Sequence, residues 1–174
     1  NQAGLIQGGQ SVKIDTQNHA LFNNNSGDQA GILSQGRLEI ANVSQLDNIS
    51  GYIATVGSAN ITVQNTNNNQ GKINSQFDLT ISQQSSGGRI DNLAGQIQAQ
   101  KNVNLNVDTL NNSGVASHIV AGEKLTVNTQ TLLNAQTKDS ITLGGIDAKN
   151  IEINAQELDN QVGAVRASEN ATLN

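Results

Sequence analysis

One short phrase returns along this chain: an aliphatic residue, then Asp or Asn, then Asn, with a Gly a few residues later. The copies are Leu46-Asp47-Asn48 before Gly51, Ile90-Asp91-Asn92 before Gly95, Leu110-Asn111-Asn112 before Gly114, and Leu158-Asp159-Asn160 before Gly163. A repeat of roughly 20 residues is too short to form a core of its own, so it must bury its apolar side chains against neighbouring copies. The chain is therefore expected to be an elongated stack of repeats.

Triplets of apolar, polar and apolar residues are the clearest strand signals in each repeat. They are Val12-Lys13-Ile14, Leu38-Glu39-Ile40, Ile61-Thr62-Val63, Leu79-Thr80-Ile81, Val103-Asn104-Leu105, Leu125-Thr126-Val127, Ile151-Glu152-Ile153 and Ala171-Thr172-Leu173. A shorter apolar point precedes most triplets, as at Ile53, and a third follows several of them, as at Leu110. Three short apolar faces separated by polar corners predict a coil that turns about an axis and returns.

The predicted fold is all-β: a right-handed parallel β-helix, or β-solenoid, of about eight coils with no helix. The handedness follows from the preference of parallel crossovers. Residues 1–174 are expected to form a single repeat segment, open at both ends and cut from a longer protein. Surplus residues near 82–89 and 137–146, including Ile141-Thr142-Leu143, are expected to form bulged corners or side loops.

The recurring Asn and Gly residues are interpreted as structural. In a stack, equivalent side chains lie about 4.8 Å apart, so Asn amides can donate and accept hydrogen bonds along a ladder. Asn tolerates the left-handed backbone of a sharp corner, and Gly does so more readily. The predicted corner and ladder residues are Asn48, Asn92, Asn112, Asn134 and Asn160, with Gly31, Gly51, Gly71, Gly95, Gly114 and Gly163.

Composition removes several classes of protein. The 26 Asn and 19 Gln residues would suit a disordered chain, but disordered chains lack aliphatic residues in such regular positions. The 9 basic residues are scattered and the net charge is −5, so nucleic acid is not an expected partner. No apolar run approaches the roughly 18 residues of a transmembrane segment.

A β-helical polysaccharide lyase or hydrolase is the enzymatic alternative. Such sites need carboxylates that converge on one cleft, often beside a basic residue. Here the acids recur by repeat position, His19 and His118 look isolated, and the arginines lie at different phases of the coil, namely Arg37, Arg89 and Arg166. No catalytic residue is expected, and the enzyme stays a remote alternative.

Calcium-binding repeats of the type Gly-Gly-x-Gly-x-Asp are also considered. The nearest stretch, Gly144-Gly145-Ile146-Asp147, lacks the third Gly and is not repeated. No metal and no cofactor are therefore expected, and without Cys the chain has neither disulfides nor thiolate ligands.

The repeat resembles that of the filamentous haemagglutinin family. Residues 90–113 carry the resemblance best: Ile90-Asp91-Asn92, Gly95 and Ile97, then Val103-Asn104-Leu105, then Leu110-Asn111-Asn112. Residues 46–63 and 158–173 are similar, so the likeness covers nearly the whole chain. The motif is structural, and no functional residue is carried over from the family.

That resemblance implies a giant exoprotein of a Gram-negative bacterium, secreted to the exterior of the outer membrane with the help of an outer-membrane secretion partner. Members act in adhesion or in contact-dependent growth inhibition. The expected role here is a stalk segment that projects an adhesive, receptor-binding or toxin module toward a host or neighbouring bacterial cell. The alternative is that the segment itself binds a receptor or glycan on the target cell. End-to-end self-association of the isolated segment is also expected, because open coils are templates for strand pairing.

Overall fold

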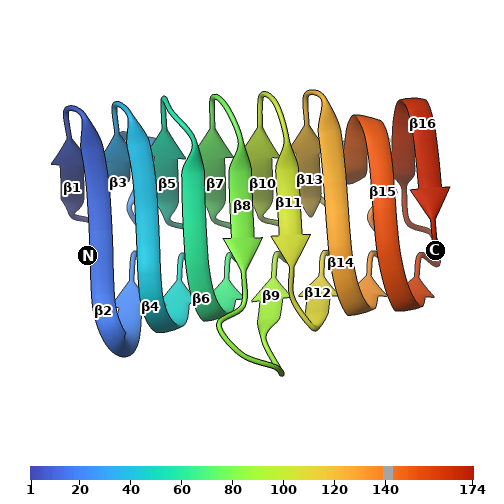
Figure 1. The fold of residues 1–174 in the computed structure, drawn as a ribbon, viewed down its shortest axis with the longest axis horizontal. Helices are drawn as coiled ribbons and strands as arrows, with labels where there is room; N and C mark the ends of the chain where they lie inside the picture. Colours follow the sequence, from blue (N-terminus) through green and yellow to red (C-terminus); the bar gives the residue numbers. More distant parts are fainter. Residues whose placement is uncertain (139–142) are drawn as a thin grey trace.

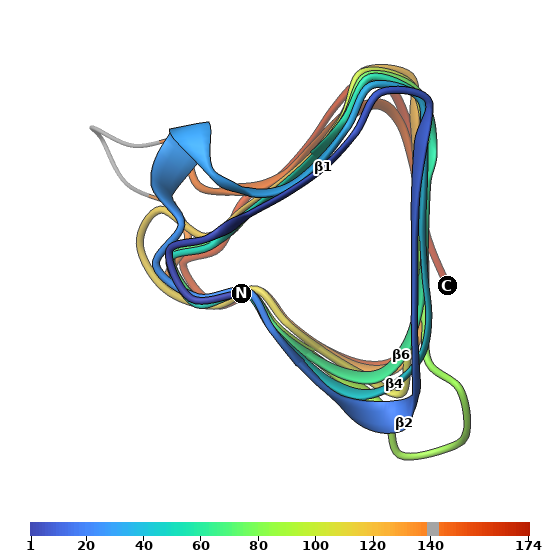
Figure 2. The ribbon, with the colours of Figure 1, turned by 90° about the vertical axis from the view of Figure 1, so that its left-hand side faces the viewer.

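The chain forms a β-solenoid of about seven turns (Figure 1). The computed structural model describes residues 1–138 and 143–174. Viewed from the N-terminal end, the chain runs clockwise as it recedes, so the coil is right-handed (Figure 2). The predicted all-β parallel fold is confirmed, and about eight coils is close to the observed number. Within the described residues there is one short 3-10 turn, Gly27–Gln29, and no helix that is long and apolar enough to cross a membrane.

The cross-section is a triangle with three strand-bearing faces (Figure 2). The first face carries β1 (Leu5–Gly8), β3 (Gly31–Ser34), β5 (Tyr52–Thr55), β7 (Lys72–Ser75), β10 (Gln96–Ala99), β13 (His118–Ala121), and the starts of β15 (Gly145–Asp159) and β16 (Val165–Leu173). The second face carries β2 (Ser11–Phe22), β4 (Arg37–Asp47), β6 (Ala59–Asn67), β8 (Leu79–Ser82), β11 (Val103–Asn106) and β14 (Lys124–Leu133), followed by later parts of β15 and β16. The longer strands turn the corner onto the third face, where β9 (Arg89–Asp91) and β12 (Thr109–Asn111) complete the other coils.

The core is a set of aliphatic columns that run along the axis. On the first face, equivalent residues pair in register and are fully buried: Ile32, Ile53, Ile73, Ile97, Ile119 and Ile146. Both apolar residues of each triplet point inward on the second face, as period-two alternation requires. Burying one such side chain fully contributes about 1.5–3 kcal/mol. Because the coils stack in register, every added coil extends the same narrow core.

The predicted side loops have two different outcomes. Residues 83–88 leave the coil between β8 and β9 and project from the corner between the second and third faces (Figures 1 and 2). The loop lies against its neighbours, because Gln84 Nε2 donates to Val43 O at 2.8 Å and Gly87 N to Asp108 Oδ2 at 2.5 Å. In the second predicted loop, residues 139–142 lie outside the described residues.

Candidate functional site

A ladder of asparagine amides runs inside the corner between the third and first faces. Each Nδ2 except that of the last member donates to the Oδ1 of the Asn in the following coil, at 2.7–2.8 Å. The members are Asn1, Asn23, Asn48, Asn68, Asn92, Asn112, Asn134 and Asn160, and all but Asn1 and Asn160 are fully buried. Most Nδ2 groups also donate to backbone carbonyls, as Asn92 does to Gly95 O at 3.1 Å. The ladder therefore provides hydrogen bonds for polar groups that would otherwise be buried in the corner without partners.

The five predicted ladder residues all lie in this column, but Asn1, Asn23 and Asn68 had not been predicted. Asn23 follows Leu21-Phe22, and Asn68 follows Thr66-Asn67, so neither fits the phrase of an aliphatic residue, then Asp or Asn, then Asn. Strand pairing reveals them, because Leu21 aligns with Leu46, and Thr66 with both Leu46 and Ile90. The signal available in the sequence was the spacing of about one coil between successive Asn residues rather than the local phrase.

Four of the six predicted glycines share one corner geometry. At each, the Gly N donates to the carbonyl of the ladder Asn three residues earlier, at 2.9–3.2 Å. A Cβ on the Gly would overlap the carbonyl oxygen of the ladder Asn one coil before. These glycines are Gly51, Gly71, Gly95 and Gly163.

The expectation that Gly supplies the left-handed backbone at these corners is wrong. The positive φ belongs to the preceding residue, which is Ser50 (49°), Gln70 (57°), Ala94 (51°) or Val162 (55°). Glycine is needed at the next position because two coils approach too closely for a side chain. Gly31 and Gly114 differ, with φ of 98° and 92°, and they lie in longer corners.

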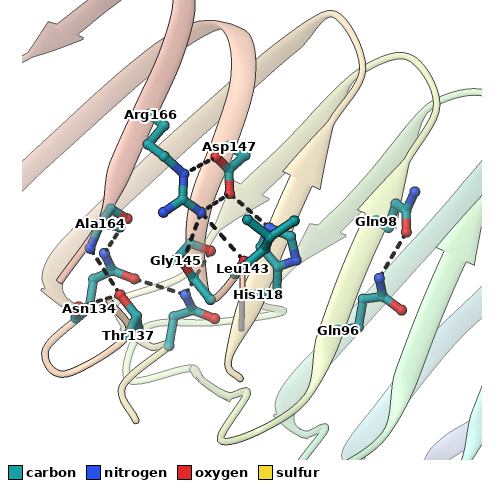
Figure 3. A network of polar contacts seen from close by, with 12 residues as sticks. Gln96, Gln98, His118, Asn134, Thr137, Leu143, Gly145, Asp147, Ala164 and Arg166 are labelled. Carbon is teal, nitrogen blue, oxygen red and sulfur yellow. Dashed lines mark hydrogen bonds and ion pairs between the residues drawn. The ribbon is translucent and has the colours of Figure 1, made fainter. Parts of the chain in front are cut away.

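A charged cluster joins three successive coils of the first face (Figure 3). His118 Nε2 lies 2.7 Å from Asp147 Oδ2, and Arg166 donates from Nε to Asp147 Oδ1 at 2.5 Å and from Nη2 to Oδ2 at 2.6 Å. Arg166 Nη2 also donates to Gly144 O at 2.9 Å. The view of His118 as an isolated residue is thus wrong: adjacent rungs bring it and Arg166 to one carboxylate.

Electrostatics keep this carboxylate ionised. Burial raises the pKa of Asp147, but hydrogen bonds from His118 and Arg166, together with their charges, outweigh it, so the pKa lies below its ordinary value. The hydrogen bond to Asp147 raises the pKa of Arg166. Both carboxylate oxygens are occupied, so the group is suited to tying coils together rather than to taking a proton from a substrate.

A groove of about 370 Å³ follows the first face across four coils, from β3 to β10, up to the corner with the second face. Leu33, Tyr52, Ala54, Asn74 and Gln98 point outward into it from consecutive rungs. None of its lining residues is charged. Of the surfaces described, this one has the concavity and mixed polarity typical of a ligand site.

No group of three or more His, Cys, Asp or Glu side chains that could hold a metal ion occurs within residues 1–138 and 143–174. Comparisons with protein-family models, with curated proteins and with solved structures give no match for this chain.

Proposed function

We propose that this chain is a structural stalk segment of a large secreted exoprotein on the exterior of the outer membrane of a Gram-negative bacterium. It holds an adhesive, receptor-binding or toxin module away from the cell, in adhesion or in contact-dependent growth inhibition. In this proposal the full-length protein is exported with an outer-membrane secretion partner, and the segment has no catalytic activity.

The observation that supports the proposal is the regularity of the interior. The same isoleucine column and the same Asn ladder continue from coil to coil along the molecule. A solenoid of this kind gains length with every repeat, and each repeat contacts only its neighbours. Length and stiffness are the properties that a spacer needs.

Two measurements test the stalk. Antibodies against residues 1–174 should label intact cells of the producing bacterium, and labelling that requires permeabilised cells would contradict a surface location. Small-angle scattering of the purified chain should fit a short prism about 34 Å long, since about seven turns rise about 4.8 Å each. Scattering from an expanded, unfolded chain would remove the geometric basis of the proposal.

The second candidate function is that the segment itself contacts a receptor or glycan on a host or neighbouring bacterial cell. The uncharged groove on the first face favours it, since a pure spacer has no need of a concave surface. Binding of the fluorescently labelled chain to whole target cells separates the two functions: a pure stalk shows none, whereas saturable binding supports the second.

A further inference from the structure

We infer that the groove on the first face binds an uncharged oligosaccharide of N-acetylated sugars. The inference rests on the second function proposed above, in which the segment has affinity of its own, and it names the site and the chemistry of the ligand.

The groove has the size and shape of a binding site. Its volume of about 370 Å³ lies within the range of about 300–1,000 Å³ that ligand sites occupy. The first face bends toward the solenoid axis in cross-section (Figure 2), and the groove lies along this face. An elongated ligand lying along the axis would meet a new set of side chains at intervals of about 4.8 Å.

The lining combines amides with apolar groups and carries no charge. Gln76, Gln98 and Asn74 supply side-chain groups that both donate and accept hydrogen bonds. Beside them lie Leu33, Ala54 and the half-buried ring of Tyr52. Hydroxyl groups of a sugar would form hydrogen bonds with the amides, and its ring would stack on the tyrosine. The methyl of an acetamido group would pack against Leu33 and Ala54. A charged ligand would find no opposite charge among these lining residues.

One polar atom in this lining lacks a partner. Asn74 Oδ1 is covered and accepts no hydrogen bond from any residue of the described chain. An unpaired buried acceptor is costly. If the Asn74 amide turned, this oxygen would face the groove and would accept a hydrogen bond from a ligand hydroxyl or acetamide N–H.

An extended peptide fits this face less well. Peptides that add to sheets do so through free backbone groups at an edge. The strands beneath the groove are interior ones, because β5 pairs with β3 and β7, and β7 with β5 and β10. Their backbone groups are used in coil pairing, so recognition here must run through side chains, and that arrangement suits a polyhydroxylated ligand.

The test uses the tetramer of N-acetylglucosamine as the probe, with titration calorimetry of residues 1–174, alongside an array of neutral and acidic oligosaccharides. We expect binding that Tyr52→Ala weakens by about tenfold, equivalent to about 1.4 kcal/mol, because the variant lacks the ring on which a sugar would stack. Ala54→Glu, which places a charge between Leu33 and Asn74, should abolish it. Phe22→Ala is the matched control, because that ring is 51% exposed and lies outside the groove. Circular dichroism confirms that each variant is folded.

Three results would overturn the inference. Binding to whole cells without binding to any neutral oligosaccharide would leave the second function standing and point to a protein receptor. Sugar binding that is indifferent to both Tyr52→Ala and Ala54→Glu would place the site elsewhere. Absence of binding to cells and to sugars would remove the inference and the second function together, leaving the stalk.

Discussion

A buried threonine shows how closely each interior position is specified. Thr66 lies in the third-face column between Leu46 and Ile90, is 2% exposed, and its hydroxyl has no hydrogen-bond partner among the described residues. The same residue interrupts the sequence pattern, because it stands where other repeats have Leu or Ile. Because Thr66 stands in place of an aliphatic residue, the phrase that marks other ladder residues is absent before Asn68. The in-register pairing of Thr66 with Leu46 and Ile90 shows where Asn68 lies.

Thr66→Val should stabilise the chain by about 1–2 kcal/mol, because it removes an unpaired buried hydroxyl and keeps the shape of the side chain. The midpoint of urea unfolding measures it. Thr55→Val is the control: Thr55 is also buried, but its hydroxyl donates to Gly36 O and accepts from Gly57 N at 3.2 Å, so its loss should destabilise. Shifts of the same sign in both variants would contradict this reading of Thr66.

The corner glycines give a second test at single positions. Gly95→Ala would drive a Cβ into the carbonyl oxygen of Asn68, which belongs to a paired backbone that cannot move freely. We expect a loss of about 1–3 kcal/mol in the free energy of unfolding, measured by denaturant titration. Gly9→Ala is the matched control, since no atom of the described residues lies within 4 Å of the added group, apart from its chain neighbours. Equal effects of the two substitutions would refute the role of close approach.

At the scale of elements, the Asn ladder acts across coils rather than within one. Asn92 accepts a hydrogen bond from Asn68 Nδ2 and donates one to Asn112 Oδ1, so Asn92→Ala would leave both buried groups without this partner. Each buried group that loses its partner costs about 1–3 kcal/mol, and we expect the free energy of unfolding to fall by about 3 kcal/mol in total. Hydrogen exchange should show the loss concentrated in the coils that hold Asn68, Asn92 and Asn112. Asn111→Ala, which removes a half-exposed amide bonded to Asp91, should cost far less; an equal cost would show that burial is not what matters.

The cluster on the first face predicts a dependence on pH. The pKa of Asp147 is lower in the folded chain, so its ionised form stabilises the fold above the unfolded pKa, and this contribution is lost as the pH falls through the folded value. The difference in stability between the natural chain and Asp147→Asn should therefore persist from neutral pH down to about pH 4 and shrink as the pH falls further. Thermal unfolding across that range measures it. Adding Arg166→Gln to Asp147→Asn should lower the stability little further, because both substitutions break the same bridge between Asp147 and Arg166. If the two losses of stability simply added, the bridge would be contradicted.

The elements also show what the sequence could predict. Alternating triplets such as Leu79-Thr80-Ile81 identify the second face, because period two allows only one inward set. The cluster of His118, Asp147 and Arg166 could not be seen in the same way. Its members are 29 and 19 residues apart, and the surplus residues near 137–146 obscure which positions align. Only the pairing of Val120 with Asp147, and of Asp147 with Arg166, places them on adjacent rungs.

For the molecule as a whole, the ends of the stack differ from its middle. Within the described residues β1 pairs only with β3, β2 only with β4, and β16 only with β15. Core positions become exposed there: Ile6, which continues the column of Ile32, is 36% exposed in the first coil, and Leu173 is 50% exposed in the last. Leu173 continues the column of Ile153, which is 1% exposed. A solenoid presents such faces wherever its stack is interrupted, and unlike faces at the two ends favour head-to-tail contacts that do not close.

Residues 1–174 in isolation should therefore associate end to end as their concentration rises, with particle length growing while the cross-section stays constant. Small-angle scattering and sedimentation velocity over a concentration series measure both quantities. Leu173→Lys should suppress the association, because an inward-pointing charge at an open end disfavours strand pairing. Val115→Lys is the matched control, since Val115 is 54% exposed but lies in a corner at the side of the stack. If the natural chain stays monomeric at high concentration, or if both lysine variants act alike, the ends are not the adhesive surfaces, and growth by stacking is not a property of this rod.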